Sequence, residues 1–174
     1  MLETIRSRRS IRRFKPDPIP EPTVRDLLEA AMLAPSAGDQ RPWQFVVLDD
    51  PLLLAKVPTV HPHATMVPQA PLAILVCGDL SREQHQGFWV QDCAAATENL
   101  LLAVTASGLG AVWLGVYPRQ ERVDGLRRLL GLPEQVVPFA LVPVGRPAEF
   151  PGRDDRFDPS RIHRNRWGAS TAEP

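Results

Sequence analysis

Residues 34–45 read Ala34-Pro35-Ser36-Ala37-Gly38-Asp39-Gln40-Arg41-Pro42-Trp43-Gln44-Phe45. The predicted helix before them opens at Pro22-Thr23 and ends at Ala34, because a residue that precedes proline resists the α conformation. The predicted strand after them runs from Trp43 to Leu48, and we expect the Trp43 ring to lie in the core. This stretch therefore connects two core elements.

A second unusual stretch, Arg8-Arg9-Ser10-Ile11-Arg12-Arg13-Phe14, places four arginines and a serine directly behind a short helical start. Guanidinium groups match phosphate oxygens two at a time, and a neighbouring hydroxyl adds a further donor. The stretch is thus a candidate phosphate site, and a solvated basic face is the alternative.

The remaining hydrophobic pattern predicts an α+β domain. Continuous apolar runs predict buried strands, and apolar stripes at helical spacing predict helices. The residues between 58 and 68 are rich in proline and histidine, and we expect them to be irregular, with one helical turn at 64–66. The expected strands cover residues 72–77, 111–116 and 136–144, and the expected helices cover residues 89–107 and 120–130.

The predicted helix 89–107 is apolar around most of its circumference, with Gly108 in the position that caps a helix C-terminus. A helix of this kind must be buried on most sides. In a chain of 174 residues the natural cover is a second copy, so we expect a homodimer in which Leu101 or Val104 faces the partner.

Composition excludes several classes of function. The chain has 20 basic and 20 acidic side chains, so it lacks the basic excess of a protein that binds nucleic acid or anionic membranes. No run approaches the ~20 apolar residues of a membrane span, and the N-terminus is charged from Glu3 onward, so we expect a cytoplasmic protein. Cys77 and Cys93 lie in apolar segments and are expected to be buried thiols.

No internal repeat or linker divides the chain, so we expect one domain over residues 1–174. From about residue 146 the composition shifts to proline, glycine, aspartate and arginine. The tail 146–174 has too few apolar residues for a core of its own, and we expect it to extend over the partner subunit.

The motifs of this chain, and the order in which they occur, resemble those of the nitroreductase family of small FMN-dependent oxidoreductases. The resemblance rests on Arg8 to Ser10, on Pro35 to Trp43, on the long helix, and on Gly108-Leu109-Gly110-Ala111-Val112-Trp113-Leu114-Gly115. A closing His163-Arg164-Asn165-Arg166-Trp167 is similar to the C-terminal signature of some short members. The resemblance covers about residues 3–167 and implies a mixed central sheet flanked by helices, built as an intertwined homodimer.

The resemblance assigns the FMN phosphate to Arg8, Ser10 and Arg12, with Arg9 adding backbone or side-chain contacts. It also implies one arginine from the C-terminal tail, and we take Arg156 as the candidate. A surface ion pair of Arg156 with Asp154 or Asp155 is the alternative.

By the same resemblance, Pro35, Ser36, Ala37 and Asp39 reach the flavin from the opposite subunit. Asp39 stands where the family has asparagine, and an ionised carboxylate only accepts hydrogen bonds. Either Asp39 bonds the ribityl hydroxyls and Arg41, or this contact is lost.

Trp113, Leu114 and Gly115 match the strand end at which the family places backbone N–H groups near flavin N5 and O4. Glycine permits the close approach that such a contact needs. Gln69-Ala70-Pro71 matches the pyrimidine-edge segment only loosely.

No side chain stands out as an acid, a base or a nucleophile. The four histidines lack the spacing of a metal site, and His61-Pro62-His63 is interpreted as a polar loop. This absence suits a flavin enzyme, in which the cofactor carries the chemistry.

The resemblance implies a ping-pong reaction in which NADH or NADPH reduces FMN by hydride transfer and a small nitroaromatic, quinone or similar flat acceptor reoxidises it. Two alternatives stay open. One is a non-catalytic flavin-binding module, and the other is a specialised reaction such as reductive dehalogenation or flavin fragmentation. Those specialised branches usually carry a lid insertion, and the segment 51–68 is short.

Overall fold

The computed structural model describes residues 1–152 and 155–168, and its centre is an antiparallel sheet of five strands. Long strands β2 (Leu72–Asp79) and β5 (Val136–Gly145) pair along their whole length. Strand β1 (Trp43–Leu48) pairs with β2 on one side, and β3 (Gly110–Ala111) and β4 (Leu114–Gly115) pair with β5 on the other.

The α+β architecture confirms the prediction, and its strands follow the apolar runs closely. We expected a mixed sheet. All pairings between named strands are antiparallel, and the parallel component among the described residues is an isolated bridge between Ser10 and Ala111. The N-terminal basic stretch is thereby joined to the sheet edge.

The predicted strand 111–116 is wrong in one respect, because it is split into β3 and β4. Ala111 pairs with Val144 and Leu114 pairs with Leu141, so both pieces keep one register along β5. That register places Pro143 opposite Val112 at the break. Proline has no backbone N–H to donate, so the ladder cannot continue there.

A second proline of β5 also coincides with an irregularity. Pro138 pairs with Cys77, and the register between β2 and β5 shifts between Val76 and Cys77. Prolines inside sheets are tolerated at bulges, where the ladder is already interrupted.

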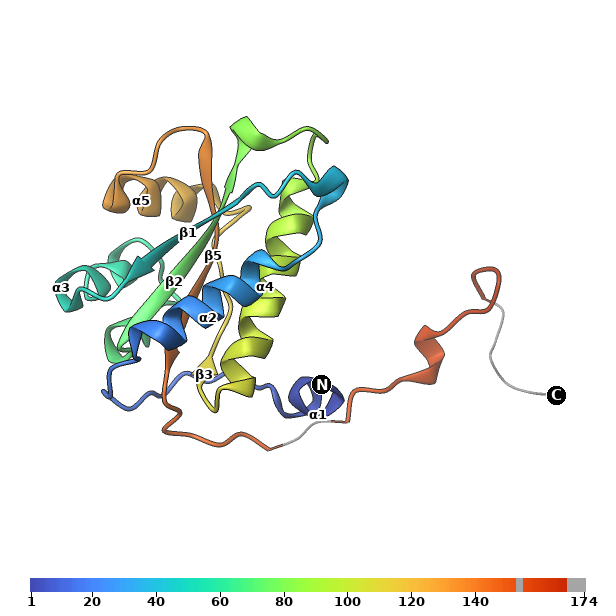
Figure 1. Ribbon diagram of the computed structural model, residues 1–174, viewed down its shortest axis with the longest axis horizontal. Coiled ribbons are helices and arrows are strands. Elements are labelled where there is room, and N and C mark those ends of the chain that lie inside the picture. The colour runs from blue at the N-terminus through green and yellow to red at the C-terminus, as the bar shows by residue number, and fades with distance from the viewer. Residues whose placement is uncertain (153–154, 169–174) are drawn as a thin grey trace.

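The helices form two layers around the sheet (Figure 1). Helices α2 (Glu21–Met32) and α4 (Trp89–Ala106) pack on each other and cover one face, while α5 (Gln120–Leu130) and the short α3 (Pro51–Leu54) lie on the other side. Helix α1 (Leu2–Ser7) lies near the C-terminal end of α4. Short 3₁₀ turns occupy Ala37–Asp39, Val57–Thr59, Val67–Gln69, Leu80–Arg82 and Pro159–Arg161.

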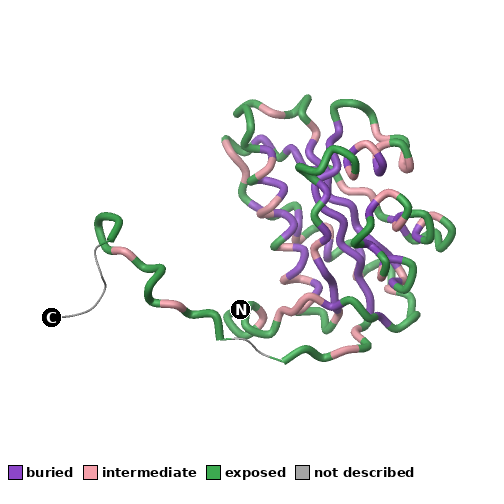
Figure 2. Tube along the Cα trace, turned by 180° about the vertical axis from the view of Figure 1, so that it is seen from behind, coloured by how far each residue is buried: buried purple, intermediate pink, exposed green. Residues whose placement is uncertain are grey.

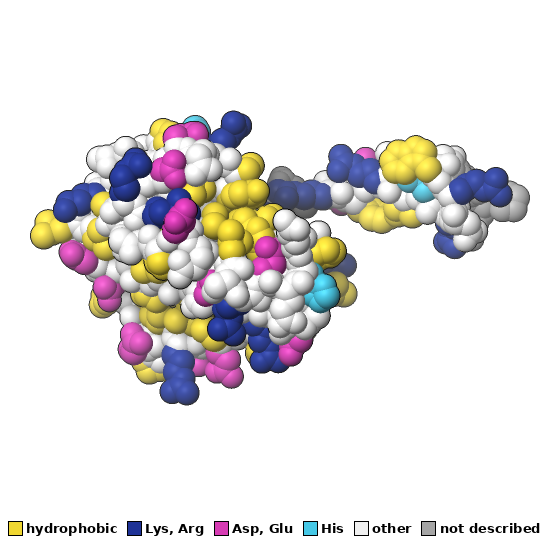
Figure 3. Space-filling view, turned by 90° about the horizontal axis from the view of Figure 1, so that it is seen from above, with side chains coloured by type: hydrophobic (Ala, Val, Ile, Leu, Met, Phe, Trp, Pro, Cys, Tyr) yellow, Lys and Arg dark blue, Asp and Glu magenta, His cyan; other side chains and the backbone are white. Residues whose placement is uncertain are grey.

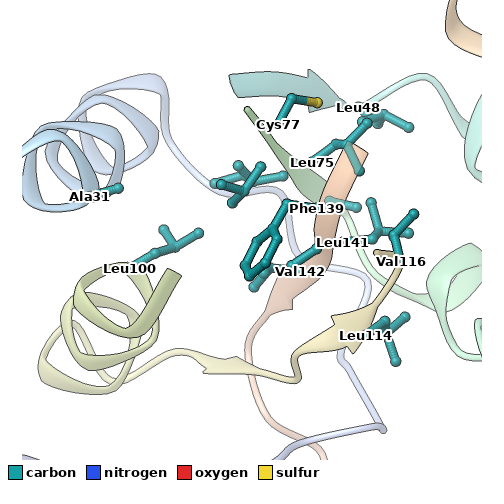
Figure 4. Packing of buried hydrophobic residues seen from close by; sticks show 14 of the residues in the cluster. Ala31, Leu48, Leu75, Cys77, Leu100, Leu114, Val116, Phe139, Leu141 and Val142 are labelled. Atoms are coloured by element: carbon teal, nitrogen blue, oxygen red, sulfur yellow. The ribbon is translucent and has the colours of Figure 1, made fainter. Parts of the chain in front are cut away.

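The core lies between these layers, and the sheet is its most buried part (Figure 2). Every residue of β5 and seven of the eight residues of β2 are buried, which explains their uninterrupted apolar sequences. Figure 4 shows Leu100 of α4 and Ala31 of α2 on one side of the sheet, with Leu114 and Val116 on the other. Trp43 is buried in β1, as predicted.

Helix α4 turns a different face outward from the one we expected. Leu101 and Val104 are only 5% and 1% exposed, so both face the core of their own chain. The expectation that one of them faces a partner is therefore wrong. Leu102 and Ala106 are apolar residues of this helix that are not part of its buried face.

The C-terminal end of α4 is capped as predicted. Gly108 adopts a φ of +70°, and the Leu109 N–H donates to the Val104 carbonyl at 3.0 Å. This arrangement satisfies a helix-end carbonyl and turns the chain back toward β3.

The two cysteines are buried free thiols, as expected. Burial raises the pKa of Cys77 to about 12 and also raises the pKa of Cys93. Both thiols are therefore protonated and unreactive at neutral pH. None of the helices in the described part of the chain is long and apolar enough to cross a membrane.

The C-terminal tail leaves the body later than residue 146. The Lys15 N–H donates to the Arg146 carbonyl, the Ala148 N–H donates to the Arg13 carbonyl, and both contacts are 2.9 Å long. Beyond residue 154 the described chain extends away from the body and carries exposed arginine and hydrophobic side chains (Figures 1 and 3). Phe157 and Trp167 are 75% and 89% exposed.

Candidate functional site

Four segments that are distant in sequence enclose a pocket of about 490 Å³, here called the Gly115 pocket. They are the N-terminal basic stretch, the turn at 61–66, strand β4 with Trp113, and the first turn of α5. The volume lies in the range of small-molecule sites. The pocket is lined by Arg12, His61, Pro62, His63, Thr65, Met66, Trp113, Leu114, Gly115 and Arg122.

The lining of the Gly115 pocket is cationic on one side and apolar on another. It includes two arginines and two histidines and no carboxylate, while Trp113, Leu114 and Met66 supply apolar surface. The Trp113 ring is held edge-on against Phe139, with ring centroids 5.7 Å apart. Such a pocket suits a flat ligand that carries negative charge or electron-rich oxygens.

The backbone of Gly115 faces the free edge of β4. The Val116 N–H donates to the Phe139 carbonyl at 3.1 Å, so Val116 faces β5. Neighbouring residues of a strand turn their N–H and C=O groups to opposite sides, so those of Gly115 face away from β5. A Cβ added at Gly115 would meet nothing within 4 Å, so this backbone is open to a ligand.

His61 lies next to the backbone of Gly115 and is only 1% exposed. Its Nε2 donates to the Gly115 carbonyl at 3.0 Å, since a carbonyl oxygen can only accept. Burial lowers the pKa of His61, which favours the neutral ring at neutral pH. His61 lies in a loop, as interpreted, but the turn at 61–66 folds its ring inward, which the sequence did not indicate.

Arg122 of α5 provides a second donor to the same oxygen. Its Nη1 lies 2.8 Å from the Gly115 carbonyl. No group of three or more metal-ligating side chains exists within the described residues, so neither histidine of the pocket belongs to such a cluster.

The N-terminal basic stretch runs in extended conformation along β3. The Ile11 N–H donates to the Ala111 carbonyl at 2.8 Å, next to the bridge between Ser10 and Ala111. Residues two apart in an extended segment project to the same side. Ser10 therefore projects to the side from which Arg12 lines the Gly115 pocket, although it does not line the pocket itself. The Arg8 side chain instead lies beside α4, where its Nε is 3.9 Å from the Glu98 carboxylate.

Arg9 projects to the opposite side of this stretch. It lines a separate pocket of about 340 Å³ together with Ile11. Its Nε donates to the Gly152 carbonyl at 2.7 Å, and its Nη1 donates to the carbonyls of Arg6 and Arg8. The Arg9 side chain is thus engaged by backbone oxygens, and the structure does not bring it together with Arg12.

Pro35, Ser36, Ala37 and Asp39 lie at the other end of α4. The Ala37 N–H donates to the carboxylate of Asp92, in the first turn of α4, at 2.9 Å. Arg9 lies near Thr105 in the last turn of this helix. Asp92 and Thr105 are thirteen residues apart in the helix, which corresponds to about 20 Å. Within one chain the 35–39 loop is therefore remote from the basic stretch.

A buried polar network holds the 35–41 loop in place. Gln40 is 4% exposed and donates to the Asp92 carboxylate at 2.6 Å, while its side-chain oxygen accepts from the N–H groups of Gln84 and His85. The buried amide is therefore satisfied on both ends.

Asp39 pairs with Arg41, which is one part of the first outcome expected for this residue. The two contacts are 2.7 Å and 2.6 Å long, and both side chains are exposed. The hydrogen bonds from Arg41 lower the pKa of Asp39, so this carboxylate is ionised at neutral pH. A contact of Asp39 with ribityl hydroxyls stays a prediction.

Two weaker expectations concern residues outside the Gly115 pocket. Arg156 lies in the extended tail, so its phosphate contact stays a prediction, and Asp154 lies outside the described residues. The Asp155 carboxylate accepts from the Phe157 N–H at 3.2 Å. In place of Gln69-Ala70-Pro71, the preceding residues Thr65 and Met66 line the pocket.

Three residues that line the pocket, His61, His63 and Arg122, were not predicted from the sequence as site residues. One signal was available in Gly125, since an isolated glycine inside a helix often marks a close approach of another segment. A Cβ at Gly125 would lie 2.7 Å from the Val60 Cβ, so this glycine lets α5 approach the residue before His61.

The model of the nitroreductase family matches residues 5–59 and 51–146 of the chain. A protein of Methanothermobacter thermautotrophicus, provisionally named an NADH dehydrogenase/NAD(P)H nitroreductase, is 53% identical over 167 residues. This alignment covers 96% of the present chain and 87% of the relative.

Two solved structures share the fold over nearly the whole chain. A provisionally named NADH dehydrogenase/NAD(P)H nitroreductase from Parabacteroides distasonis superposes with a TM-score of 0.92 at 38% identity, covering 95% of this chain and 98% of that one. A provisionally named nitroreductase from Desulfovibrio desulfuricans, solved in complex with FMN, gives a TM-score of 0.78 at 32% identity and covers 89% and 90%.

Proposed function

Because the chain belongs to the nitroreductase family, we propose that it is an FMN-dependent oxidoreductase that uses NADH or NADPH to reduce small flat acceptors such as nitroaromatics or quinones. The observation that carries the proposal is the Gly115 pocket, which joins an open backbone edge to a cationic, carboxylate-free lining. FMN bound there supplies two-electron transfer from NAD(P)H to the acceptor in successive half-reactions.

The residues of the Gly115 pocket fit the flavin ring. Arg12 was expected at the phosphate, but it lines the pocket beside Trp113 and Leu114, so we propose it as a cation for the electron-rich pyrimidine edge. Trp113 and Leu114 offer apolar surface. The Gly115 N–H faces the open edge of β4, where it can donate to a ring atom. Ser10, on the same side of the extended stretch as Arg12, and Arg8, which follows helix α1, would hold the phosphate, as the family resemblance implies.

The proposed enzyme is a homodimer with two sites at its interface. Within one chain the 35–39 loop is remote from the basic stretch that contains Arg8 and Ser10, so a site that uses both segments needs a second copy. An apolar surface of α1, α2 and α4 supports such a copy, and we call it the α4 patch. The α4 patch is lined by Met1, Thr4, Ile5, Ala30, Leu33, Asn99, Leu102, Ala103 and Ala106.

The C-terminal tail is proposed to pack on this partner. Phe157, Ile162 and Trp167 are exposed in the single chain, although large apolar side chains gain free energy by burial. A second subunit offers them a surface, and the same arrangement would bring Arg156 toward a phosphate of the partner's site.

A specialised lid-dependent reaction receives no support from the segment 51–68. Leu54, Val57, Ala64 and Val67 of this segment are all at most 2% exposed. These residues anchor the segment in the core, and its part at 61–66 forms a wall of the Gly115 pocket.

The proposal is tested by purifying the protein and recording its visible spectrum before and after addition of NADH or NADPH without air. We expect a yellow protein that the nicotinamide bleaches and that a quinone or nitroaromatic restores. A yellow protein that neither nicotinamide bleaches would instead be a flavin-binding module, and a colourless protein that takes up no added FMN would refute the flavin site.

Replacement of Gly115 with valine gives a local test of the site. The added side chain meets no atom of the chain within 4 Å at its Cβ position, so the melting temperature should stay near that of the wild type. In the proposed complex it would displace the ring from the Gly115 N–H. We expect at least tenfold slower reduction by NAD(P)H in stopped-flow measurements, in line with the loss of one oriented donor. Normal reduction rates would exclude this backbone contact.

A further inference from the structure

Gly115 is a glycine in a short strand. Strand β4 has two residues, and among the described parts of the chain its partner strand is β5. Glycine has more backbone freedom than any other residue, so the direction of its N–H is weakly fixed by local geometry. A site that depends on this N–H needs another source of rigidity.

Two side chains from different elements supply that rigidity. His61 follows the 3₁₀ turn at Val57–Thr59, and Arg122 lies in α5, yet both donate to the Gly115 carbonyl, at 3.0 Å and 2.8 Å. Gly125 makes this convergence possible, because a side chain there would push α5 away from Val60. A glycine inside a helix lowers the stability of that helix. The close approach of α5 to Val60 explains why Gly125 is nevertheless present.

The stability of the fold alone does not explain why a histidine occupies position 61. Its Nδ1 is buried and has no hydrogen-bond partner among the described residues, and the same holds for Arg122 Nε. A buried polar atom without a partner costs free energy, whereas an apolar side chain of similar volume at position 61 would avoid this cost. The pair is therefore better explained by what it does to Gly115.

We propose that His61 and Arg122 are positioning residues that lock the Gly115 carbonyl and thereby aim the Gly115 N–H into the pocket. This inference rests on the proposed function, since the ligand that receives the N–H is the flavin ring. The N–H and the carbonyl of Gly115 face the same edge of β4, so fixing one restricts the other. Neither side chain needs to exchange a proton or touch the acceptor.

The test compares His61→Leu and Arg122→Met with the donor-retaining variants His61→Gln and Arg122→Lys. Arg128→Met serves as a matched control, because Arg128 is an exposed arginine of the same helix that does not line the Gly115 pocket. Each protein is titrated with FMN by fluorescence, and the midpoint potential of the bound flavin is measured against a reference dye. The melting temperature of each FMN-free protein is recorded separately.

We expect FMN to bind about tenfold more weakly to each donor-deleting variant, as for the loss of one hydrogen bond to a fixed group. The potential should shift to more negative values, because a misdirected N–H no longer stabilises the charge that the ring gains on reduction. The donor-retaining variants should recover part of both effects, and Arg128→Met should match the wild type.

Wild-type affinity and potential in both donor-deleting variants would overturn the proposal, whatever happens to their melting temperatures. If His61→Leu does not fold, the Arg122→Met variant alone tests the proposal. Arg122 is only partly buried, so its replacement leaves the core intact. A wild-type protein that binds no FMN would refute the proposed function and this inference together, which distinguishes that result from failure of the positioning role alone.

Discussion

FMN is expected to bind at least about a hundredfold more weakly when Arg8 and Ser10 are both replaced with alanine. The two residues are proposed to hold the phosphate, and a hydrogen bond to a charged group contributes about 1.5–3 kcal/mol. Two such losses correspond to a hundredfold or more in the dissociation constant. Equilibrium titration of the FMN-free variant, followed by flavin fluorescence, measures the effect.

Arg13→Ala is the matched control for this double variant. Arg13 is a neighbouring exposed arginine of the same stretch, and it lines neither the Gly115 pocket nor the pocket that contains Arg9. We expect its FMN affinity to stay near that of the wild type. A double variant that is isolated with full flavin occupancy and unchanged affinity would show that the phosphate lies elsewhere.

Replacement of Leu102 with aspartate is expected to dissociate the dimer and release most of the flavin. Leu102 belongs to the α4 patch, and an ionised carboxylate at the centre of an apolar interface costs several kcal/mol without a partner. The remaining fold should survive, because Leu102 is not part of the buried stripe of α4. Light scattering should give a mass near the 19.3 kDa of one chain, whereas the wild type should give about twice that value.

Leu52→Asp is the control for this variant. Leu52 is 75% exposed in α3, on the other side of the sheet, so the same change there should leave mass and flavin content unaltered. A Leu102→Asp protein that remains dimeric would place the interface on another surface. Yellow, active wild-type protein with the mass of a single chain would exclude a shared site altogether.

Most elements of the fold could be predicted from the sequence because their hydrophobic patterns are unambiguous. The structure places β1 at Trp43–Leu48 and α5 at Gln120–Leu130, as expected. The break between β3 and β4 could not be predicted in this way. It arises where Pro143 lies opposite Val112, and such a cross-strand neighbour is known only once the pairing is known.

The orientation of α4 was harder to predict for a different reason. Alanine and leucine occur on nearly all sides of this helix, so no single stripe identifies the buried face. Successive residues on a helix differ by about 100° in direction, which separates buried Leu101 from partly exposed Leu102. A charge at Leu101 would therefore disrupt the core, and it would not test the interface.

The candidate site was predictable where its residues are adjacent in sequence. Trp113, Leu114 and Gly115 line the Gly115 pocket, and Arg12 joins them because the extended N-terminal stretch pairs with the neighbouring Ala111. His61 is 54 residues from Gly115, and its contact depends on how closely α5 packs against the 57–60 turn. Packing of this kind has no one-dimensional pattern, so His61 and Arg122 emerged only from the structure.

The network around Asp92 has a consequence for the way two chains would associate. Gln40 and Asp92 fix the 35–41 loop to the chain's own α4 and to the backbone at Gln84 and His85. The loop thus loses its conformational freedom during folding of the monomer, and little ordering entropy remains to oppose association. Two subunits that meet through such loops dock as preformed surfaces, so their encounter is governed by diffusion and orientation.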